Sequence, residues 1–312
     1  MGTSLPGILA RVLTESISRE LSARSEDVTL AGTLWLPAGK PTATVLMHPG
    51  SGPSDRDNDV FFPPIRDHLL AAGVAVASFD KRGVGGSTGR WQEAAIVEQA
   101  ADAICCLELV RREVSGPVGL FGHSQGGWVV VEAAARCPEA AFVISSSGPG
   151  VTPERQERYA TQLHLRRSGI AEEEIDDVRR YYDDVVSMMR ARVSLEEARR
   201  RVEEEGFPQA FAILQLPVLP DDEAEWKLVA AMIDYDPRPA LERIRVPTLA
   251  VFGGDDPITP VKESVAVFRE AVRPDLLHVE VFAGAGHRLE EGDPPRFAKG
   301  YLETLTAFVL GE

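Results

Sequence analysis

Short runs of consecutive apolar residues recur in the first and last parts of the chain and predict the strands of a buried sheet. Continuous runs such as residues 43–47 and 74–79 are typical of parallel strands that are covered on both faces. Residues 28–36 instead alternate between apolar and polar positions and stop at Pro37, which predicts an exposed-edge strand. Further strands are expected at residues 117–121, 140–144, 248–252 and 276–282.

Helical periodicity fills the segments between these runs. Between residues 92 and 113, apolar residues recur at spacings of four and three, as on one face of an amphipathic helix. Further helices are expected at residues 64–72, 127–135 and about 295–309. Strands that alternate with helices predict an α/β fold with a mostly parallel, doubly wound sheet.

The middle of the chain differs in character, because residues 151–235 are charged and helical and carry no strand pattern. Pro153 stands in the first turn of one predicted helix, and Ser194 and Glu197 form the capping box of another. A helical block between two strands is most simply a cap over the sheet edge at which ligands bind. We therefore expect a core domain at residues 1–150 and 236–312 and an inserted helical cap, or lid, at residues 151–235.

Several large apolar side chains of this segment need a surface to pack against. The stripe that includes Tyr182 and Met189 is expected to build the core of the cap itself. Residues 207–216 differ, because Pro208 and Pro217 prevent a long regular helix there. We expect Phe207, Phe211 or Leu214 to face the ligand-binding edge of the sheet and to set which ligands fit there.

Composition restricts the classes of partner. The net charge of −15 and the pI near 4.9 argue against nucleic acid or an anionic membrane as the main partner. Three cysteines cannot form a disulfide framework, and no His/Cys spacing resembles a metal site, so neither metal nor organic cofactor is expected. The first ten residues lack the basic and apolar regions of a signal peptide, which favours a cytoplasmic location. The oligomeric state stays open.

The most informative motif is Gly122-His123-Ser124-Gln125-Gly126, which lies between a predicted strand and a predicted helix. A strand that turns directly into a helix exposes the residue at the turn, and glycines two positions away let the two backbones pass. Free N–H groups at the start of the helix can stabilise an oxyanion. Ser124 is therefore the candidate nucleophile.

A serine nucleophile needs a histidine base, which is oriented by a carboxylate. His287 follows a glycine-rich turn after the last predicted strand and is the candidate base. The acid should follow a strand between serine and histidine, where Asp255 and Asp256 are adjacent. Chemistry alone leaves the choice between them open.

An oxyanion hole needs two N–H donors. One is expected from Gln125, directly after the nucleophile, and the other from the loop at residues 48–53. Pro49 has no N–H, so the second donor is Gly50 or Ser51, and we favour Ser51.

These residues resemble the α/β-hydrolase superfamily in their order of nucleophile, acid and histidine. The superfamily pattern Gly-x-x-Asp-x-x-x-Pro matches Gly253, Asp256 and Pro260, so the resemblance implies Asp256 rather than Asp255 as the acid. Residues 80–87 are similar to its Asp-x-Arg-Gly-x-Gly-x-Ser turn. Residues 50–57 look like the Gly-Ser-Gly-Pro-x-Asp-Arg-Asp loop of serine carboxylesterases related to dienelactone hydrolases and prolyl-peptidase-type enzymes. The resemblance implies an α/β-hydrolase fold, and we expect Asp55, Arg56 and Asp57 to brace this loop.

The sequence thus predicts a serine hydrolase that cleaves a small-molecule carboxylic ester through an acyl-enzyme intermediate. One alternative keeps the same triad but acts on an amide, peptide or thioester, or transfers the acyl group to another acceptor. A charged anchor inside the cap would favour a peptide substrate. The second alternative is a non-catalytic ligand sensor on a hydrolase scaffold.

Overall fold

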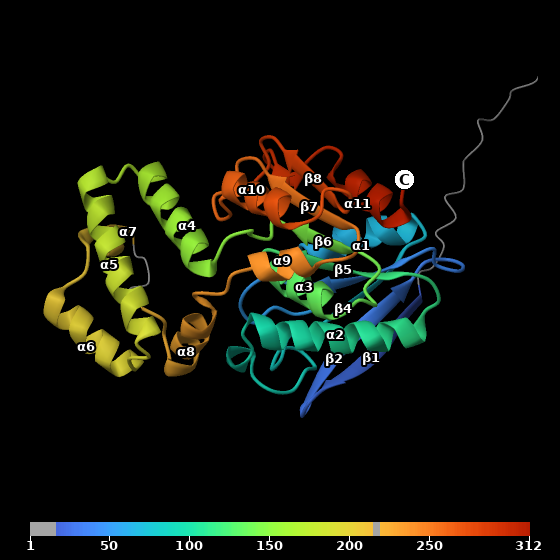
Figure 1. The fold of residues 1–312 in the computed structure, drawn as a ribbon, viewed down its shortest axis with the longest axis horizontal. Helices are drawn as coiled ribbons and strands as arrows, with labels where there is room; N and C mark the ends of the chain where they lie inside the picture. The colour runs from blue at the N-terminus through green and yellow to red at the C-terminus, as the bar shows by residue number, and fades with distance from the viewer. Residues whose placement is uncertain (1–16, 215–218) are drawn as a thin grey trace, which may run out of the picture.

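One eight-stranded sheet forms the centre of the molecule (Figure 1). The computed structural model describes residues 17–214 and 219–312, so the expectations about the first ten residues and about Pro217 lie outside the described residues. In sheet order the strands are β1 (Ile17–Ser25), β2 (Val28–Leu36), β4 (Ala75–Phe79), β3 (Thr44–His48), β5 (Val118–His123), β6 (Val143–Ser146), β7 (Thr248–Gly253) and β8 (Leu277–Phe282). Six neighbouring strands from β4 to β8 are parallel, whereas β2 runs antiparallel to both of its neighbours. The predicted mostly parallel α/β fold is confirmed.

The prediction of an exposed edge at residues 28–36 is wrong. Strand β2 lies inside the sheet, and β1 pairs with its outer side over the whole length of both strands. Only Ala23 and Ser25 of β1 are buried, and charged residues occupy several of its exposed positions. An edge strand with so few apolar residues gives little hydrophobic signal.

Helices cover both faces of the sheet and enclose two hydrophobic clusters. On one face lie α2 (Ile96–Glu113), α3 (Gln125–Arg136), α9 (Arg238–Arg243) and α10 (Val261–Ala271). On the other face lie α1 (Phe62–Ala71) and α11 (Tyr301–Leu310). A short 3-10 helix, η1 (Trp91–Glu93), precedes α2. The helix expected at residues 295–309 begins only at Tyr301, because β10 (Arg296–Phe297) pairs with β9 (Glu290–Glu291).

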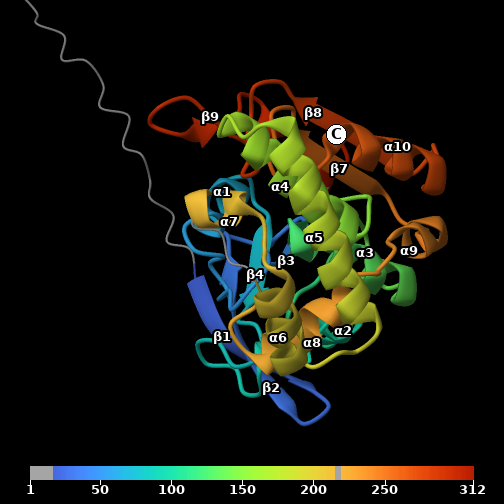
Figure 2. The same ribbon diagram turned by 90° about the vertical axis from the view of Figure 1, so that its left-hand side faces the viewer.

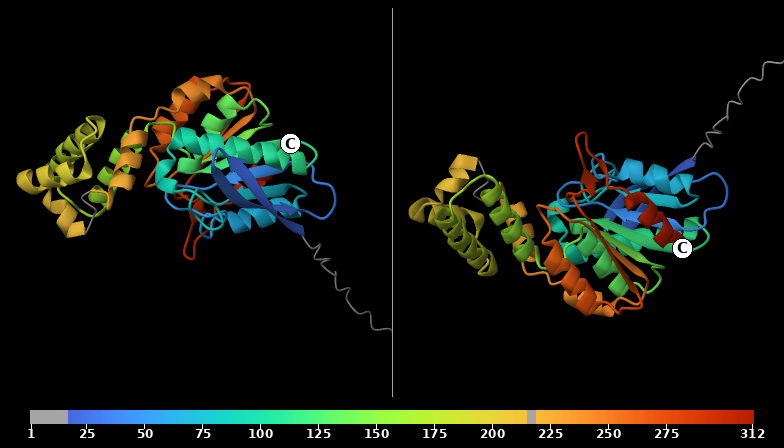
Figure 3. Two further views of the ribbon diagram at one scale, coloured as in Figure 1. Left: turned by 90° about the horizontal axis from the view of Figure 1, so that it is seen from below. Right: turned by 90° about the horizontal axis from the view of Figure 1, so that it is seen from above.

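A helical insertion lies between β6 and β7 and projects from one end of the sheet (Figures 1 and 3). Figure 2 views this insertion end-on, in front of the sheet. It contains α4 (Pro153–Arg167), α5 (Glu172–Arg190), α6 (Leu195–Glu205), α7 (Gln209–Leu214) and α8 (Glu223–Met232). The hydroxyls of Thr152 and Ser194 accept backbone N–H bonds at the starts of α4 and α6, as the cap residues of helices do. A third hydrophobic cluster is built from residues of these helices and includes Trp226, whose indole N–H donates to the Val193 carbonyl at 2.8 Å.

Candidate active site

The turn between β5 and α3 holds Ser124 in a strained backbone conformation. Its φ of 54° and ψ of −121° are rare for a residue with a side chain. A Cβ atom on Gly122 would collide with the Gly126 carbonyl, and one on Gly126 would collide with the carbonyl oxygens of His48 and Pro49. Both glycines are therefore required for the close approach of strand, helix and neighbouring loop, and the turn presents Ser124 at the end of the sheet.

Three predicted residues meet at this turn in one hydrogen-bonded chain. Nε2 of His287 lies 2.9 Å from the Ser124 hydroxyl oxygen, and Nδ1 of His287 lies 2.8 Å from Oδ2 of Asp256. The other oxygen of Asp256 accepts the backbone N–H groups of Ile258 at 2.7 Å and Thr259 at 2.9 Å. The Asp256 side chain is fully buried, so these bonds fix the carboxylate firmly against the imidazole.

The neighbouring aspartate takes a different position. Asp255 is exposed, and its backbone N–H donates to the Ala285 carbonyl at 2.9 Å. The geometry therefore places Asp256, and not Asp255, against the histidine. On the other side of this loop, the Tyr159 hydroxyl of α4 donates to the Asp256 backbone carbonyl at 3.2 Å. Tyr159 links the helical insertion to the acid loop, a contact that sequence reasoning missed because the two segments are far apart along the chain.

The loop between β3 and α1 lies beside Ser124. The Gly50 N–H donates to Oδ1 of the buried Asn58 at 3.1 Å, so this N–H is already occupied. Ser51 borders the same cleft as Ser124, and Gln125 is the first residue of α3. This arrangement favours Ser51 over Gly50 as the loop's free N–H donor.

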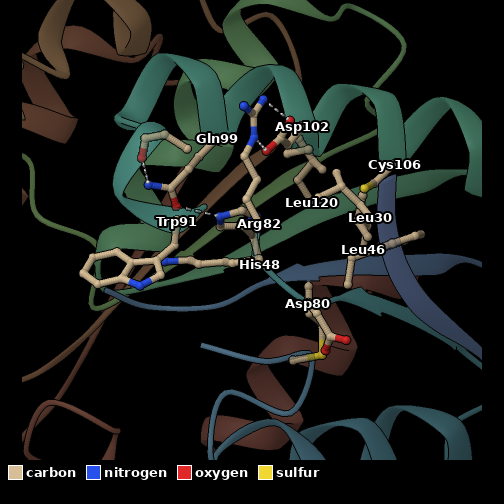
Figure 4. Close-up of a pocket in the computed structure, with 15 residues that line it drawn as sticks. Leu30, Leu46, His48, Asp80, Arg82, Trp91, Gln99, Asp102, Cys106 and Leu120 are labelled. Carbon is tan, nitrogen blue, oxygen red and sulfur yellow. Dashed lines mark hydrogen bonds and ion pairs between the residues drawn. The ribbon is translucent and has the colours of Figure 1, made fainter. Parts of the chain in front are cut away.

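Charged residues after β4 brace this region. Arg56 binds Asp80 with Nη2 to Oδ2 at 2.8 Å, and it also reaches Glu20 at 2.8 Å, so it braces the loop as expected. Arg82 forms a buried, two-pronged pair with Asp102, at 2.6 and 2.8 Å (Figure 4). Asp80, Arg82 and Asp102 border a small internal cavity of about 30 Å³ (Figure 4). Both arginines therefore support the structure, and neither lines the cleft over Ser124.

The cleft over Ser124 has a volume of about 610 Å³, and most of the residues that line it are polar or charged. Besides Ser124 and His287, it is lined by Gln156 and Glu157 of α4, Asp55 and Asp59 of the loop, and Arg288. A second cavity of about 280 Å³ shares Ser51 with the cleft. Its walls include apolar side chains of Trp91 and α8 (Leu228, Val229 and Met232) and the polar side chains of Lys81, Gln99, Gln125 and Glu225. The helical insertion thus supplies walls to both spaces.

The predicted substrate-binding residues lie elsewhere. Phe211 is buried in the core of the helical insertion, where it contacts Tyr181, and Leu214 packs against the same cluster. Phe207 is 47% exposed and borders a separate cavity formed only by the insertion. The structure therefore corrects this expectation. Residues 209–214 form a short helix despite Pro208, and this helix turns its apolar side toward α5 instead of the cleft.

The described residues hold neither a metal-binding cluster nor a helix that could span a membrane. No group of three or more His, Cys, Asp or Glu side chains is arranged there to hold a metal ion. Within residues 17–214 and 219–312, no helix combines the length and apolar character that a membrane crossing requires.

Comparison with known proteins places this fold and site in one family. The family model described as the alpha/beta hydrolase family matches residues 45–299, so the chain belongs to the α/β hydrolase family. The chain is 25% identical over 284 residues to esterase EstD of Thermotoga maritima, and the match covers 87% of this chain but only 61% of EstD.

Solved structures show the same fold. The Pyrococcus furiosus esterase Pf2001 aligns with a TM-score of 0.62 at 16% identity, over 94% of this chain and 90% of that one. Est1E of Butyrivibrio proteoclasticus, solved with ferulic acid bound, aligns with a TM-score of 0.57 at 17% identity, over 93% of this chain and 96% of that one. The chain thus belongs to the α/β hydrolase family and shares its fold with proteins named as esterases.

Proposed function

We propose that the protein hydrolyses carboxylic esters through an acyl-enzyme on Ser124. The observation that carries the proposal is the continuous hydrogen-bonded chain from Ser124 through His287 to Asp256. Serine, imidazole and buried carboxylate in this order form the machinery of nucleophilic acyl transfer. The esterases among the relatives agree with this reaction class.

The reaction follows from the geometry in two halves. Ser124 Oγ attacks the acyl carbon while its proton moves to Nε2 of His287, and the N–H groups of Ser51 and Gln125 stabilise the resulting oxyanion. Collapse of this intermediate breaks the ester C–O bond, and the leaving alcohol takes the proton from Nε2. Water then attacks the acyl-enzyme by the same route and releases the acid. Asp256 keeps the proton of the neutral imidazole on Nδ1 and stabilises the imidazolium.

The helical insertion acts in this proposal as a cap that shapes the substrate site. Helix α4 covers the polar cleft, and α8 closes the cavity that continues from Ser51. The apolar side chains of α8 and Trp91 suit an acyl chain, whereas the polar cleft suits the alcohol part. A cavity of about 280 Å³ accepts a chain of several carbons. Activity should therefore change with acyl length.

The test uses p-nitrophenyl esters of two to eight acyl carbons together with a fluorophosphonate probe. The wild-type protein should hydrolyse the esters and become labelled, and Ser124→Ala should lose both properties while keeping its circular dichroism spectrum. Ser168→Ala, an exposed serine at the end of α4, is the matched control and should behave as wild type. Labelling that persists in Ser124→Ala would remove Ser124 as the nucleophile. A rate independent of acyl length would refute the α8 cavity as the acyl site.

One observation favours a second candidate, an amide or peptide hydrolase with an amine anchor. Glu157 projects from α4 into the cleft that contains Ser124, and no cation pairs with it among the described residues. The Glu157 side chain is exposed to the cleft, but the protein around it removes part of the carboxylate's solvation and so raises the pKa of Glu157. A substrate ammonium would replace this lost solvation. Aminoacyl p-nitroanilides, compared with their N-acetylated forms, test this candidate: no preference for the free amine would exclude it.

A further inference from the structure

Lys81 is a buried cation that the proposed reaction does not use. It lies between Asp80 and Arg82, each of which binds an opposite charge, at Arg56 and Asp102. Lys81 is only 7% exposed, and among the described residues no carboxylate forms an ion pair with it. A buried cation without an anionic partner is costly, so its remaining contacts deserve a functional explanation.

Within the described residues, the hydrogen bonds of the Lys81 ammonium go to oxygen atoms around the predicted oxyanion hole. Its Nζ donates to the Gly50 carbonyl, to the Gly52 carbonyl at 3.3 Å and to Oε1 of Gln125 at 3.1 Å. Gly50 and Gly52 flank Ser51, and Gln125 follows the nucleophile. One ammonium therefore connects the two segments that carry the two N–H donors.

The contact with Gly50 has a specific geometric consequence. The Gly50 carbonyl and the Ser51 N–H belong to one planar peptide group, which is trans, so the two bonds point in opposite directions. A cation held on the carbonyl oxygen directs the N–H away from Lys81. It also polarises the peptide group, which strengthens that N–H as a donor.

We propose that Lys81 is a positioning residue of the oxyanion hole: its ammonium aims the Ser51 N–H and ties the Ser51 loop to the side chain of Gln125. The proposal rests on the proposed acyl-transfer function, because only that reaction places an oxyanion there. Lys81 also borders the cavity proposed for the acyl chain, but the role assigned to it acts through the Gly50–Ser51 peptide group and the Gln125 side chain rather than through the substrate. Its contribution should appear in the transition state, where the oxyanion develops, rather than in ground-state binding.

The charge of Lys81 gives this role a pH dependence. Burial lowers the pKa of Lys81 to about 7, and its hydrogen bonds with three oxygen atoms favour the charged form. The groups around it are the His48 ring of β3, Glu225 of α8, which borders the same cavity, and the already paired Asp80 and Asp102. Loss of the Lys81 proton should weaken the polarisation of the Gly50–Ser51 peptide group.

The experiment compares Lys81→Met with Lys227→Met, which removes an exposed lysine of α8 that pairs with Glu223. For Lys81→Met we expect kcat for a p-nitrophenyl ester to fall on the order of 10²-fold, as for loss of one oxyanion donor, with KM little changed. The inhibition constant of a trifluoromethyl ketone, whose adduct carries an oxyanion, should weaken by a similar factor. Lys227→Met should match wild type in all three measurements.

The pH profile separates this role from a merely structural one. Wild-type kcat should decline on the alkaline side of neutrality as Lys81 loses its proton, and Lys81→Met should lack that decline. If Lys81→Met does not fold, Gln125→Met replaces it as the test. This variant keeps the backbone N–H of residue 125 but removes the side-chain oxygen to which Lys81 donates. It should lower kcat and leave KM unchanged. A flat wild-type profile up to pH 9.5, or a loss of Lys81→Met activity confined to KM, would overturn the proposal.

The two proposals fail in different ways. A wild-type protein that hydrolyses no ester contradicts the proposed function. The role of Lys81 is then tested by the rate at which a fluorophosphonate labels Ser124, because the phosphonyl oxygen occupies the oxyanion hole. Equal labelling rates for wild type and Lys81→Met would refute the role of Lys81. An active wild type with an equally active Lys81→Met would refute the role of Lys81 alone. A wild type that neither turns over esters nor reacts with the probe would overturn both.

Discussion

Replacing Asp256 by Asn isolates the part that the carboxylate plays in the triad. Oδ1 of Asp256 accepts the Ile258 and Thr259 N–H groups, so the amide oxygen of Asn should keep that position. The amide NH2 group would then face Nδ1 of His287, 2.8 Å away, where the carboxylate oxygen now lies. An NH2 group cannot accept a hydrogen bond, so Nδ1 must become the acceptor and the imidazole proton moves to Nε2. In that tautomer, Nε2 cannot take the proton of Ser124.

The expected cost follows from this tautomer change. The same substitution in serine proteases lowers kcat by about 10⁴, which corresponds to about 5.4 kcal/mol of activation free energy. The fold should be retained, because the two backbone bonds to the side-chain oxygen survive. The change in unfolding free energy should stay within about 1 kcal/mol, the usual net value of one hydrogen bond.

The assay is kcat/KM for a p-nitrophenyl ester, with active sites counted by fluorophosphonate titration so that traces of wild type are excluded. Asp255→Asn is the matched control. Asp255 is exposed and its recorded backbone bond does not involve the side chain, so its kcat/KM should stay near that of wild type. The reverse ranking would transfer the role to Asp255, and small effects in both variants would refute a catalytic carboxylate in this loop.

Two further predictions concern stability. Asp102→Asn leaves the buried guanidinium of Arg82 without its anion and should cost about 3–5 kcal/mol in urea unfolding. Asp183→Asn should cost at most about 1 kcal/mol, because Asp183 is 62% exposed and its partner Arg158 keeps a second anion, Glu154; equal costs would refute the distinction. His123 is buried, and burial, followed by the charges of His287 and Arg288, lowers its pKa well below the usual value. Below pH 6.5 the unfolded chain therefore binds more protons than the folded protein, so the free energy of unfolding should fall on acidification. His123→Met should reduce this fall between pH 7 and 5 by about 2 kcal/mol, and an unchanged fall would contradict the prediction.

The sequence allowed the centre of the site to be predicted because its signals are local. The glycines around Ser124 report a collision between adjacent backbones, and the apolar runs report burial on both faces of the sheet. Strand β1 was missed because its outward residues are charged, and Phe211 was misplaced because an amphipathic pattern does not say which neighbour covers the apolar side. Lys81 gave no signal, because a lysine beside Asp80 and Arg82 is usually solvated, and only the tertiary fold brings the Gly50 carbonyl to it.

The two ends of the helical insertion have a consequence for how such a protein can diversify. The insertion leaves the sheet after β6 and returns, through α9, to β7, and these two strands pair directly. Its attachment points are therefore neighbours, so the excursion between them can lengthen, shorten or be exchanged without shifting the register of the sheet. Its own hydrophobic cluster lets it keep its shape independently of the strands. Mutations that reshape the substrate walls can thus accumulate in a stretch of chain separate from the one that carries Ser124, Asp256 and His287.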